Sequence, residues 1–251
     1  MKNILEKFIT DSGVRSFDKE YRKRIQNNIS IYDSKVNAID FNFNIDFRNF
    51  IEDGYFRKRI SQGGSSLKFG GNIFISNSKT LKSNLDFIQY NFNLDGALST
   101  FKSAKFIFKI FSNYSDGPIP YQMLYALPGN LESVSKNWTF RTVRMNEYFG
   151  DKFAILFIEH QFNDELFRLL RIPYVEDLEL QLTGLFNIGW LGISEKSKSI
   201  LPVAGKELNK PLIETGFGIG HVLFPIRLEF VWRLNHLENN KFVISLNTFI
   251  L

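Results

Sequence analysis

Cysteine is absent from the 251 residues, so the chain can form no disulfide, thiolate metal site or cysteine nucleophile. Histidine is scarce, with only His160, His221 and His236. No two of the three have metal-ligand spacing on a helix face, and no Ser/His/Asp set can be assembled by spacing. Glu159 and His160 are adjacent, but in a strand their side chains would point to opposite faces. We therefore predict no enzyme activity, catalytic residues, metal site or cofactor, and assign no binding residues.

Long apolar runs are also missing. No window approaches 18 consecutive apolar residues, so the sequence predicts no transmembrane helix. The first residues, MKNILEKFITDSGVRSFDKE, contain neither an unbroken apolar segment nor a small-residue cleavage site, and they do not read as a signal peptide. We expect an exported protein to be represented here by its mature chain or by a piece of a longer one.

The charge balance is mildly basic, with 31 Lys and Arg against 26 Asp and Glu. The densest clusters are YRKR at 21–24 and YFRKRI at 55–60. Because the charges are otherwise scattered, solvated or interfacial loops explain them better than a phosphate-binding surface does. We therefore do not expect nucleic acid to be a partner.

Phenylalanine is abundant, at 27 residues, and it recurs in segments that alternate apolar and polar residues. The clearest is IDFNFNIDF, residues 39–47. Strict alternation is typical of a strand with one apolar and one polar face. In a soluble protein the apolar residues would line a core. In a transmembrane barrel they would face lipid, while Asp40, Asn42, Asn44 and Asp46 would line a wet lumen.

Ten segments suggest strands, and several reach the 9–13 residues that are typical of membrane-spanning strands rather than soluble ones. They lie at 39–47, 66–76, 86–94, 99–112, 136–149, 152–162, 178–190, 213–220, 226–234 and 241–251. Arg227, Glu229 and Arg233 fall in the middle of one segment and on one face, where a soluble core could hold them only if they were paired. The fold class that we predict is all-β: an antiparallel transmembrane β-barrel of about 10–12 strands, complete or part of a larger barrel.

One segment has a helical rather than an alternating pattern. FNDELFRLLRIP, residues 162–173, has apolar residues at helical spacing, a candidate N-cap at Asn163 or Asp164 and a proline stop. It predicts a short amphipathic helix in a connection, placed either at a membrane interface or as a plug at one end of a soluble barrel.

The connections and one glycine-rich segment complete the prediction. Tight turns are expected at 95–98, 149–152, 221–225 and 236–240, and long connections at 49–64, 113–136 and 192–211. The long connections do not alternate with short ones, so the sequence does not orient the barrel. GFGIG, residues 216–220, lacks the spacing of a phosphate-binding loop, and we interpret its glycines as relief of crowding on an inner wall or a close backbone approach.

The C-terminal half resembles a known family. The motifs are GPIPYQMLYALPGN, then FRTVRMNEYFGDKFAILFIEHQFNDELFRLLRIPYVEDLELQ, then ETGFGIGHVLFPIRLEFVWRL. In this order they resemble the C-terminal barrel of the DUF5686 family of outer-membrane proteins of Bacteroidota, over about residues 115–251. The resemblance implies an outer-membrane β-barrel of unassigned biochemical role. Family members commonly carry a carboxypeptidase-regulatory-like domain before the barrel, and none precedes Ile39, which suggests a truncated or excised part.

These observations predict an N-terminal segment at 1–34 and a β-barrel domain at 35–251. We expect a bacterial outer-membrane protein that serves transport, anchoring or membrane-protein assembly, with outer-membrane lipid and other envelope proteins as partners. An Omp85-like translocation or insertion barrel is one alternative, and a soluble β-barrel or sandwich that binds an apolar ligand is another. A membrane-embedded hydrolase would need a Ser/His or paired-carboxylate set that the sequence does not display.

Overall fold

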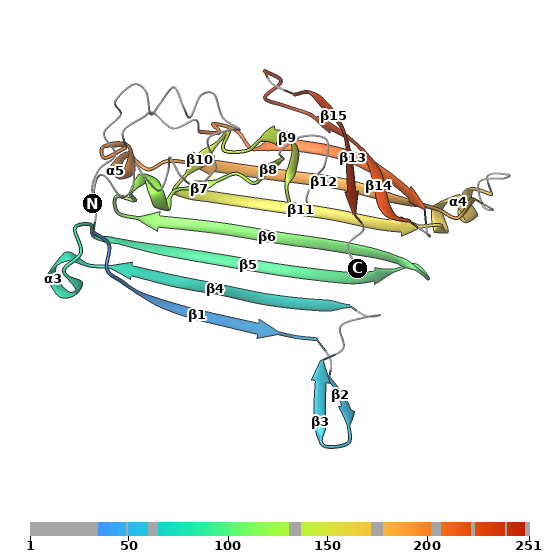
Figure 1. Ribbon diagram of the computed structural model, residues 1–251, viewed down its shortest axis with the longest axis horizontal. Helices are drawn as coiled ribbons and strands as arrows, with labels where there is room; N and C mark the ends of the chain where they lie inside the picture. The colour runs from blue at the N-terminus through green and yellow to red at the C-terminus, as the bar shows by residue number, and fades with distance from the viewer. Residues whose placement is uncertain are drawn as a thin grey trace.

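The computed structural model describes residues 35–48, 50–59, 65–130, 137–171, 178–201, 207–221, 224–238 and 240–248. Within these ranges the chain forms one nine-stranded sheet, in the order β1-β4-β5-β6-β11-β12-β13-β14-β15. Figure 1 shows the strands side by side in a curved, twisted sheet. The predicted segment 1–34 and its YRKR cluster lie outside the described residues.

Every neighbouring pair in this sheet is antiparallel, which confirms the predicted all-β class. All strands except β15 contain 9 to 14 residues. The strands are β1 (Ala38–Asp46), β4 (Ser66–Ser76), β5 (Phe87–Thr100), β6 (Ala104–Asp116), β11 (Lys152–Asn163), β12 (Leu180–Gly192), β13 (Leu212–His221), β14 (Phe224–Arg233) and β15 (Phe242–Thr248).

The two edges of the sheet are β1 and β15, and within the described residues neither pairs with a further strand. This part of the chain therefore forms an open sheet rather than a closed barrel. The strand count has a further consequence for closure. Because successive strands reverse direction, the first and ninth strands run the same way. A direct β1–β15 pair would be parallel, which is not the pairing of antiparallel barrels.

The predicted strand at 136–149 does not join the sheet, and this prediction was wrong. The segment instead forms β9 (Phe140–Arg144), which pairs in parallel with β8 (Gly129–Asn130), and β10 (Phe149–Gly150), which pairs with β7 (Tyr125–Ala126). Four successive residues, from Phe140 to Val143, are all buried. A segment covered on both sides has no solvent-facing side and so no clean alternation.

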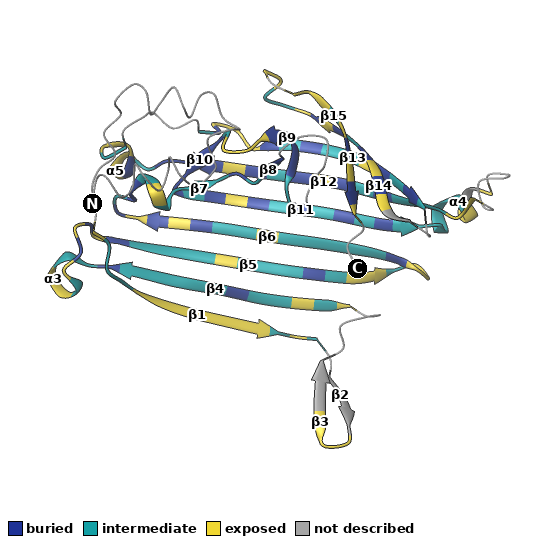
Figure 2. Cartoon of the chain, in the orientation of Figure 1, coloured by how far each residue is buried: buried dark blue, intermediate teal, exposed yellow. Residues whose placement is uncertain are grey.

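We call residues 117–130 and 137–150 the inner segment, because they lie against one face of the sheet. A short 3₁₀ turn at Tyr121–Met123 (η2) and strands β7 to β10 belong to it. Strand β9 contacts β14 and β15, and β10 contacts β12. The largest apolar core forms between this segment and the sheet. It contains Leu127, Phe140, Val143, Tyr148, Phe153, Ile155, Phe157, Leu191, Leu208 and Leu212. Figure 2 shows the resulting concentration of buried residues in β11 and β12 and the exposure of β1.

The predicted tight turn at 95–98 was also wrong, because β5 continues through these residues to Thr100 and the turn falls at Phe101–Ser103. Gly96 is not a turn residue here. It lies directly opposite Phe108 on β6, whose ring occupies the place where a Cβ would stand, 2.2 Å from the nearest ring atom. The glycine therefore accommodates a cross-strand aromatic ring inside a regular strand.

The loop at 49–64 contains a two-stranded hairpin, β2 (Phe50–Asp53) and β3 (Phe56–Arg59), outside the main sheet. The predicted helix is present as α4 (Glu165–Leu170), and Asp164 occupies its N-cap position. The Asp164 carboxylate does not bond the helix backbone; it pairs with Arg168 at 3.2 Å. Pro173 lies outside the described residues.

Two further helices, α3 (Ser78–Leu81) and α5 (Glu195–Lys198), were not predicted because each is a single turn. Asn77 and Ser194 accept backbone hydrogen bonds as their side-chain N-caps. None of the described helices has both the length and the apolar composition needed to cross a membrane.

Candidate functional site on the inner face

The nine-stranded sheet has one apolar face, which we call the outward face. Residues directly opposite in an antiparallel pair share a face. The strand register therefore shows which residues of each strand belong to the outward face. Phe41 pairs with Ile73, and Phe43 with Gly71. The outward face is solvent-accessible at both ends of the sheet: Phe41 is 58% exposed and Trp232 is 39% exposed. Its other large exposed side chains include Ile39, Phe43, Ile45, Leu67, Phe92, Leu98, Ile110, Tyr114, Phe186, Trp190, Phe217, Ile226, Leu228, Phe242, Ile244 and Leu246.

The opposite, inner face holds buried charges beneath the inner segment. The centre of this ionic cluster is Arg227 on β14, which is fully buried. It donates to both oxygens of Glu159 on β11, at 2.6 and 2.7 Å, and to Glu229 at 2.8 Å. Glu229 also accepts hydrogen bonds from the Arg141 side chain of the inner segment, at 2.9 Å, and from the Asn247 amide of β15, at 2.9 Å. The cluster therefore joins three sheet strands to the inner segment.

A third carboxylate, Glu214 on β13, fixes the backbone of the inner segment. It is fully buried and accepts hydrogen bonds from the backbone N–H groups of Arg141 at 3.0 Å and Thr142 at 3.1 Å. The Thr142 hydroxyl and the Asn187 amide also donate to it, at 2.8 and 2.7 Å. The Glu214 carboxylate thus supplies the hydrogen-bond acceptors that the buried N–H groups of Arg141 and Thr142 would otherwise find in water.

Arg233, at the end of β14, also binds the inner segment to the sheet. Its guanidinium donates to the hydroxyl of Thr142 at 3.1 Å and to the carbonyl of the same residue. Glu147 lies 3.7 Å from it. Burial, together with the nearby Glu147 carboxylate, raises the pKa of the Tyr148 phenol to about 12, so Tyr148 keeps its proton at neutral pH. The inner segment is therefore held by ionic and polar contacts as well as by its apolar core.

The glycines of GFGIG explain how the long charged side chains fit. Gly216, Gly218 and Gly220 fall on the inner face of β13, between Arg227 on β14 and Glu159 on β11. A Cβ at Gly218 would lie 3.2 Å from Cδ of Arg227 and 3.5 Å from Cγ of Glu229. Both parts of the interpretation are confirmed, each at one glycine. Gly218 relieves crowding by Arg227 and Glu229, while Gly216 allows the close approach of the backbone carbonyl of Phe230.

Substituting Gly218 with valine should therefore displace the ionic cluster. The added branches would enter the space of Arg227 and Glu229, and overpacking of this kind costs about 1–3 kcal/mol. Chemical unfolding of the purified protein measures the loss. Gly54, at the tip of the β2–β3 hairpin, is unsuitable as a control because its φ is +60°, so Ala154→Val on the exposed outward side of β11 serves instead. Equal stability of G218V and A154V would contradict this account of the glycine.

The three histidines do not converge in the structure. His160 lies on the outward side of β11, where its Nε2 atom is 2.8 Å from the Thr100 hydroxyl and its ring packs on Phe162. His236 contacts the carbonyl of Lys210 at 2.8 Å. Glu159 points inward, opposite to His160, as the alternation predicted. Within the described ranges no three His, Cys, Asp or Glu side chains are placed to hold a metal ion.

The sequence indicated part of the ionic cluster but not its partners. Arg227, Glu229 and Arg233 were noticed as charges on one face of one strand. Arg141 and Glu214 were not, although Glu214 stands on the polar side of an alternating segment. Arg141 lies 73 positions from Glu214 and 88 positions from Glu229 in the sequence, and no local pattern encodes such a pairing.

A scan against protein-family models gave no match to the chain, and a search of curated proteins gave no significant match. Membership of the DUF5686 family therefore stays a prediction carried by the sequence motifs.

Proposed function

We propose that the chain forms the wall of a transmembrane β-barrel in a bacterial outer membrane, with its outward face against lipid. The observation that carries the proposal is the inverted distribution of residues: phenylalanine, leucine and isoleucine cover the accessible face, while Arg227 and Glu229 are completely buried on the other. Monomeric soluble proteins rarely expose one continuous apolar patch beyond a few hundred Å². This outward face extends across all nine strands, which favours a hydrocarbon environment.

The soluble alternative requires the apolar residues of the outward face to be buried. In a soluble barrel or sandwich the apolar stripe of IDFNFNIDF would pack inside, whereas Ile39 is 47% exposed and Phe47 60% exposed. Strand length points the same way, because 9–11 residues are needed to cross a bilayer. Both features support the membrane proposal over the soluble one.

Aromatic residues with polar tips gather at one end of the outward face. Tyr90 and Tyr114 are paired there, and Trp190 and Trp232 lie near the same ends of β12 and β14. Long connections occur at both ends of the sheet, between β6 and β11 and between β12 and β13 at this end, and between β1 and β4 and between β11 and β12 at the other. Tyr and Trp are enriched at both membrane–water interfaces. We therefore propose that this end lies at a membrane–water interface.

Closure and biological role are further parts of the proposal. An antiparallel barrel with an even number of strands requires an odd number of strands in addition to these nine. The role would be transport, anchoring or membrane-protein assembly, within the DUF5686 family that the motifs suggest. Conductance across liposomes would separate a pore from an Omp85-like assembly factor, which would instead promote insertion of other barrels.

Tryptophan quenching by brominated lipid tests the membrane placement directly. Trp232 lies on the outward face, whereas Trp138 belongs to the inner segment and packs against Phe157, with ring centroids 6.2 Å apart. We expect lipid brominated along its acyl chains to quench a variant that retains only Trp232. A matched variant that retains only Trp138 should keep its fluorescence. Equal quenching of the two variants, or none in either, would contradict the proposal.

A further inference from the structure

Strands β1, β4, β5 and β6 carry a row of asparagines on their inner face, which is exposed at Asn42 on β1 and buried at Asn113 on β6. Asn42 pairs with Asn72, Asn72 with Asn91, and Asn91 with Asn113, so the row crosses four strands at one level. Neighbouring strands are about 4.8 Å apart, which sets the spacing of the amides. The Asn113 amide donates to Asn91 at 2.5 Å, and the Asn42 and Asn72 amides donate to Asp40 at 3.0 and 2.9 Å.

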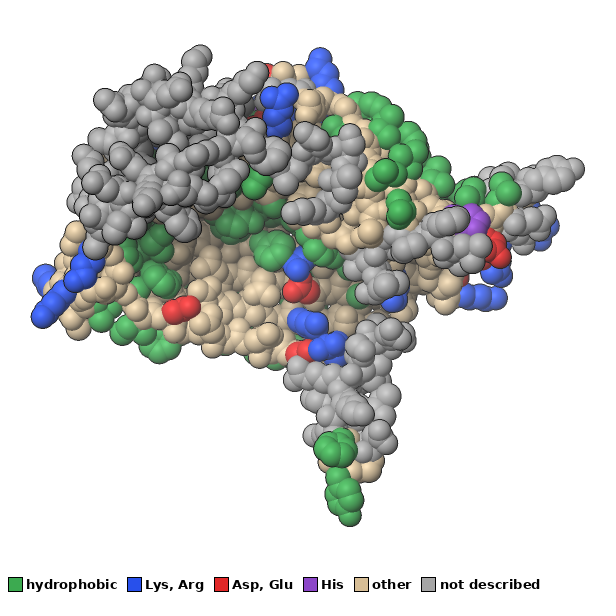
Figure 3. Space-filling view, in the orientation of Figure 1, with side chains coloured by type: hydrophobic (Ala, Val, Ile, Leu, Met, Phe, Trp, Pro, Cys, Tyr) green, Lys and Arg blue, Asp and Glu red, His purple; other side chains and the backbone are tan. Residues whose placement is uncertain are grey.

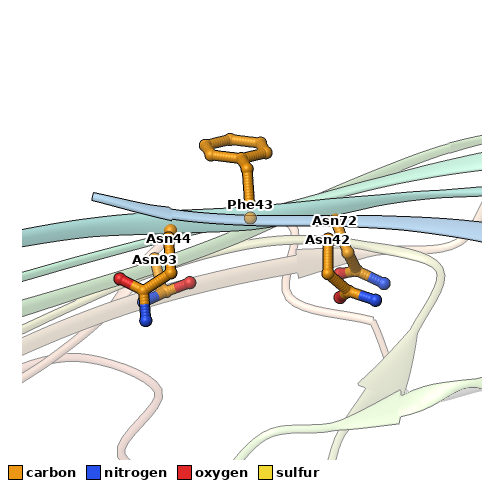
Figure 4. Close-up of a pocket in the computed structure, with 7 residues that line it drawn as sticks. Asn42, Phe43, Asn44, Asn72 and Asn93 are labelled. Carbon is orange, nitrogen blue, oxygen red and sulfur yellow. The ribbon is translucent and has the colours of Figure 1, made fainter.

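A hollow of about 340 Å³ lies beside this row. Gly70 forms part of its floor, since a Cβ there would lie 2.8 Å from Oδ1 of Asn93. Figure 4 shows the four asparagine side chains on one side of the sheet, with Phe43 pointing to the other. The residues that line the hollow are Asn42, Phe43, Asn44, Gly70, Gly71, Asn72 and Asn93.

The lining offers neutral hydrogen-bonding groups. Each asparagine amide supplies two donors and one carbonyl acceptor. The side chains of Asn44 and Asn93 form no hydrogen bond with other groups in the described part of the chain, so both are available to a ligand. Such paired donors and acceptors match vicinal hydroxyls, which also donate and accept.

The neighbouring charges do not favour an ion in the hollow. Beside it a second row crosses the same four strands and alternates in sign: Asp46, Lys68, Asp95 and Lys109. Lys109 lies 3.1 Å from Asp95, and Asp46 is paired with Arg48 at 2.7 Å. Figure 3 shows acidic and basic side chains close together on this face, over β4 and β5. Because opposite charges neutralise one another here, a neutral ligand is favoured over a charged one.

From these contacts we propose that the asparagine hollow binds a neutral glycan, with Asn44 and Asn93 as the main contacts and with Asn42 and Asn72 beside them. This inference goes beyond the proposed function and does not rest on it, because the hollow is formed by the inner face whatever surrounds the outward face. A glycan in the hollow would meet amides on β1, β4 and β5, the three strands whose asparagines line it.

Isothermal titration of the full chain with maltohexaose and with chitohexaose tests the site. The protein is kept in a detergent without a sugar head group, such as lauryldimethylamine oxide, so that no bilayer is involved. We expect the native chain to bind at least one of the two sugars. The double variant Asn44→Leu/Asn93→Leu should bind at least tenfold more weakly, whereas the exposed-loop control Asn240→Leu should bind within twofold of the native protein.

A second variant separates loss of the binding site from misfolding of the chain. Gly70→Val fills the floor of the hollow but retains every amide, and it should also weaken binding, while far-ultraviolet circular dichroism checks that each variant keeps its strands. Three results would overturn the proposal: no binding of either sugar by the native chain, undiminished binding by the folded double variant, or tighter binding of dextran sulfate than of the neutral sugars. None of these results depends on whether the outward face meets lipid.

Discussion

Replacing Arg227 with methionine is expected to lower the free energy of unfolding by about 3–5 kcal/mol, the usual cost of removing one partner from a buried ion pair. Arg227 is fully buried and donates to Glu159 and Glu229. Methionine can fill much of the volume, but it leaves Glu159 in an interior without its guanidinium. Gln161, which donates to Glu159 at 2.8 Å, does not replace the positive charge.

Urea unfolding of the protein in lipid vesicles, followed by circular dichroism, measures this loss. Arg144→Met is the matched control, because Arg144 is exposed at the end of β9 and its substitution should change stability by less than about 0.5 kcal/mol. The double variant Arg227→Met/Glu159→Leu removes both charges and should recover much of the loss. If R227M is as stable as R144M, or the double variant is less stable than R227M, the ion pair does not carry the stability assigned to it.

Strand positions in this protein could be predicted from sequence wherever the two faces of a strand differ. SLKFGGNIFIS, residues 66–76, coincides with β4, because its alternating residues have distinct surroundings on the outward and inner faces. The same contrast identifies β1 from IDFNFNIDF and places Phe41 and Phe43 together on one side. What alternation alone left open was which side meets the accessible surface, and the structure places the apolar side there.

The inner segment could not be predicted in the same way, because its surroundings come from distant residues. Phe140 and Val143 pack into the apolar core, while Arg141 and Thr142 between them meet Glu229 and Glu214. Each side of β9 thus has one apolar and one polar buried residue, so apolar and polar residues do not alternate along the strand. The hollow at Asn44 and Asn93 was missed for a related reason: its residues come from neighbouring strands, and only the register brings them together.

The sharpest test of the outward face is a single charge in its middle. Leu228 lies near the centre of β14, is 39% exposed and pairs with Ile219 on β13 and Leu246 on β15. In water, arginine at such an accessible position would change stability by only about 0.5 kcal/mol. Facing the bilayer midplane, the same Leu228→Arg substitution should cost about 2–4 kcal/mol, because the guanidinium must be transferred into hydrocarbon.

Folding into lipid vesicles distinguishes the two environments. The matched control is Leu237→Arg, since Leu237 is 46% exposed in the connection between β14 and β15 and should tolerate a charge in either environment. We expect L228R to unfold at lower urea concentration than L237R in vesicles. Equal stability of the two variants there would contradict a lipid-facing β14. A deficit confined to L228R would locate the hydrocarbon at the centre of this strand, on the side opposite the buried Arg227 and Glu229.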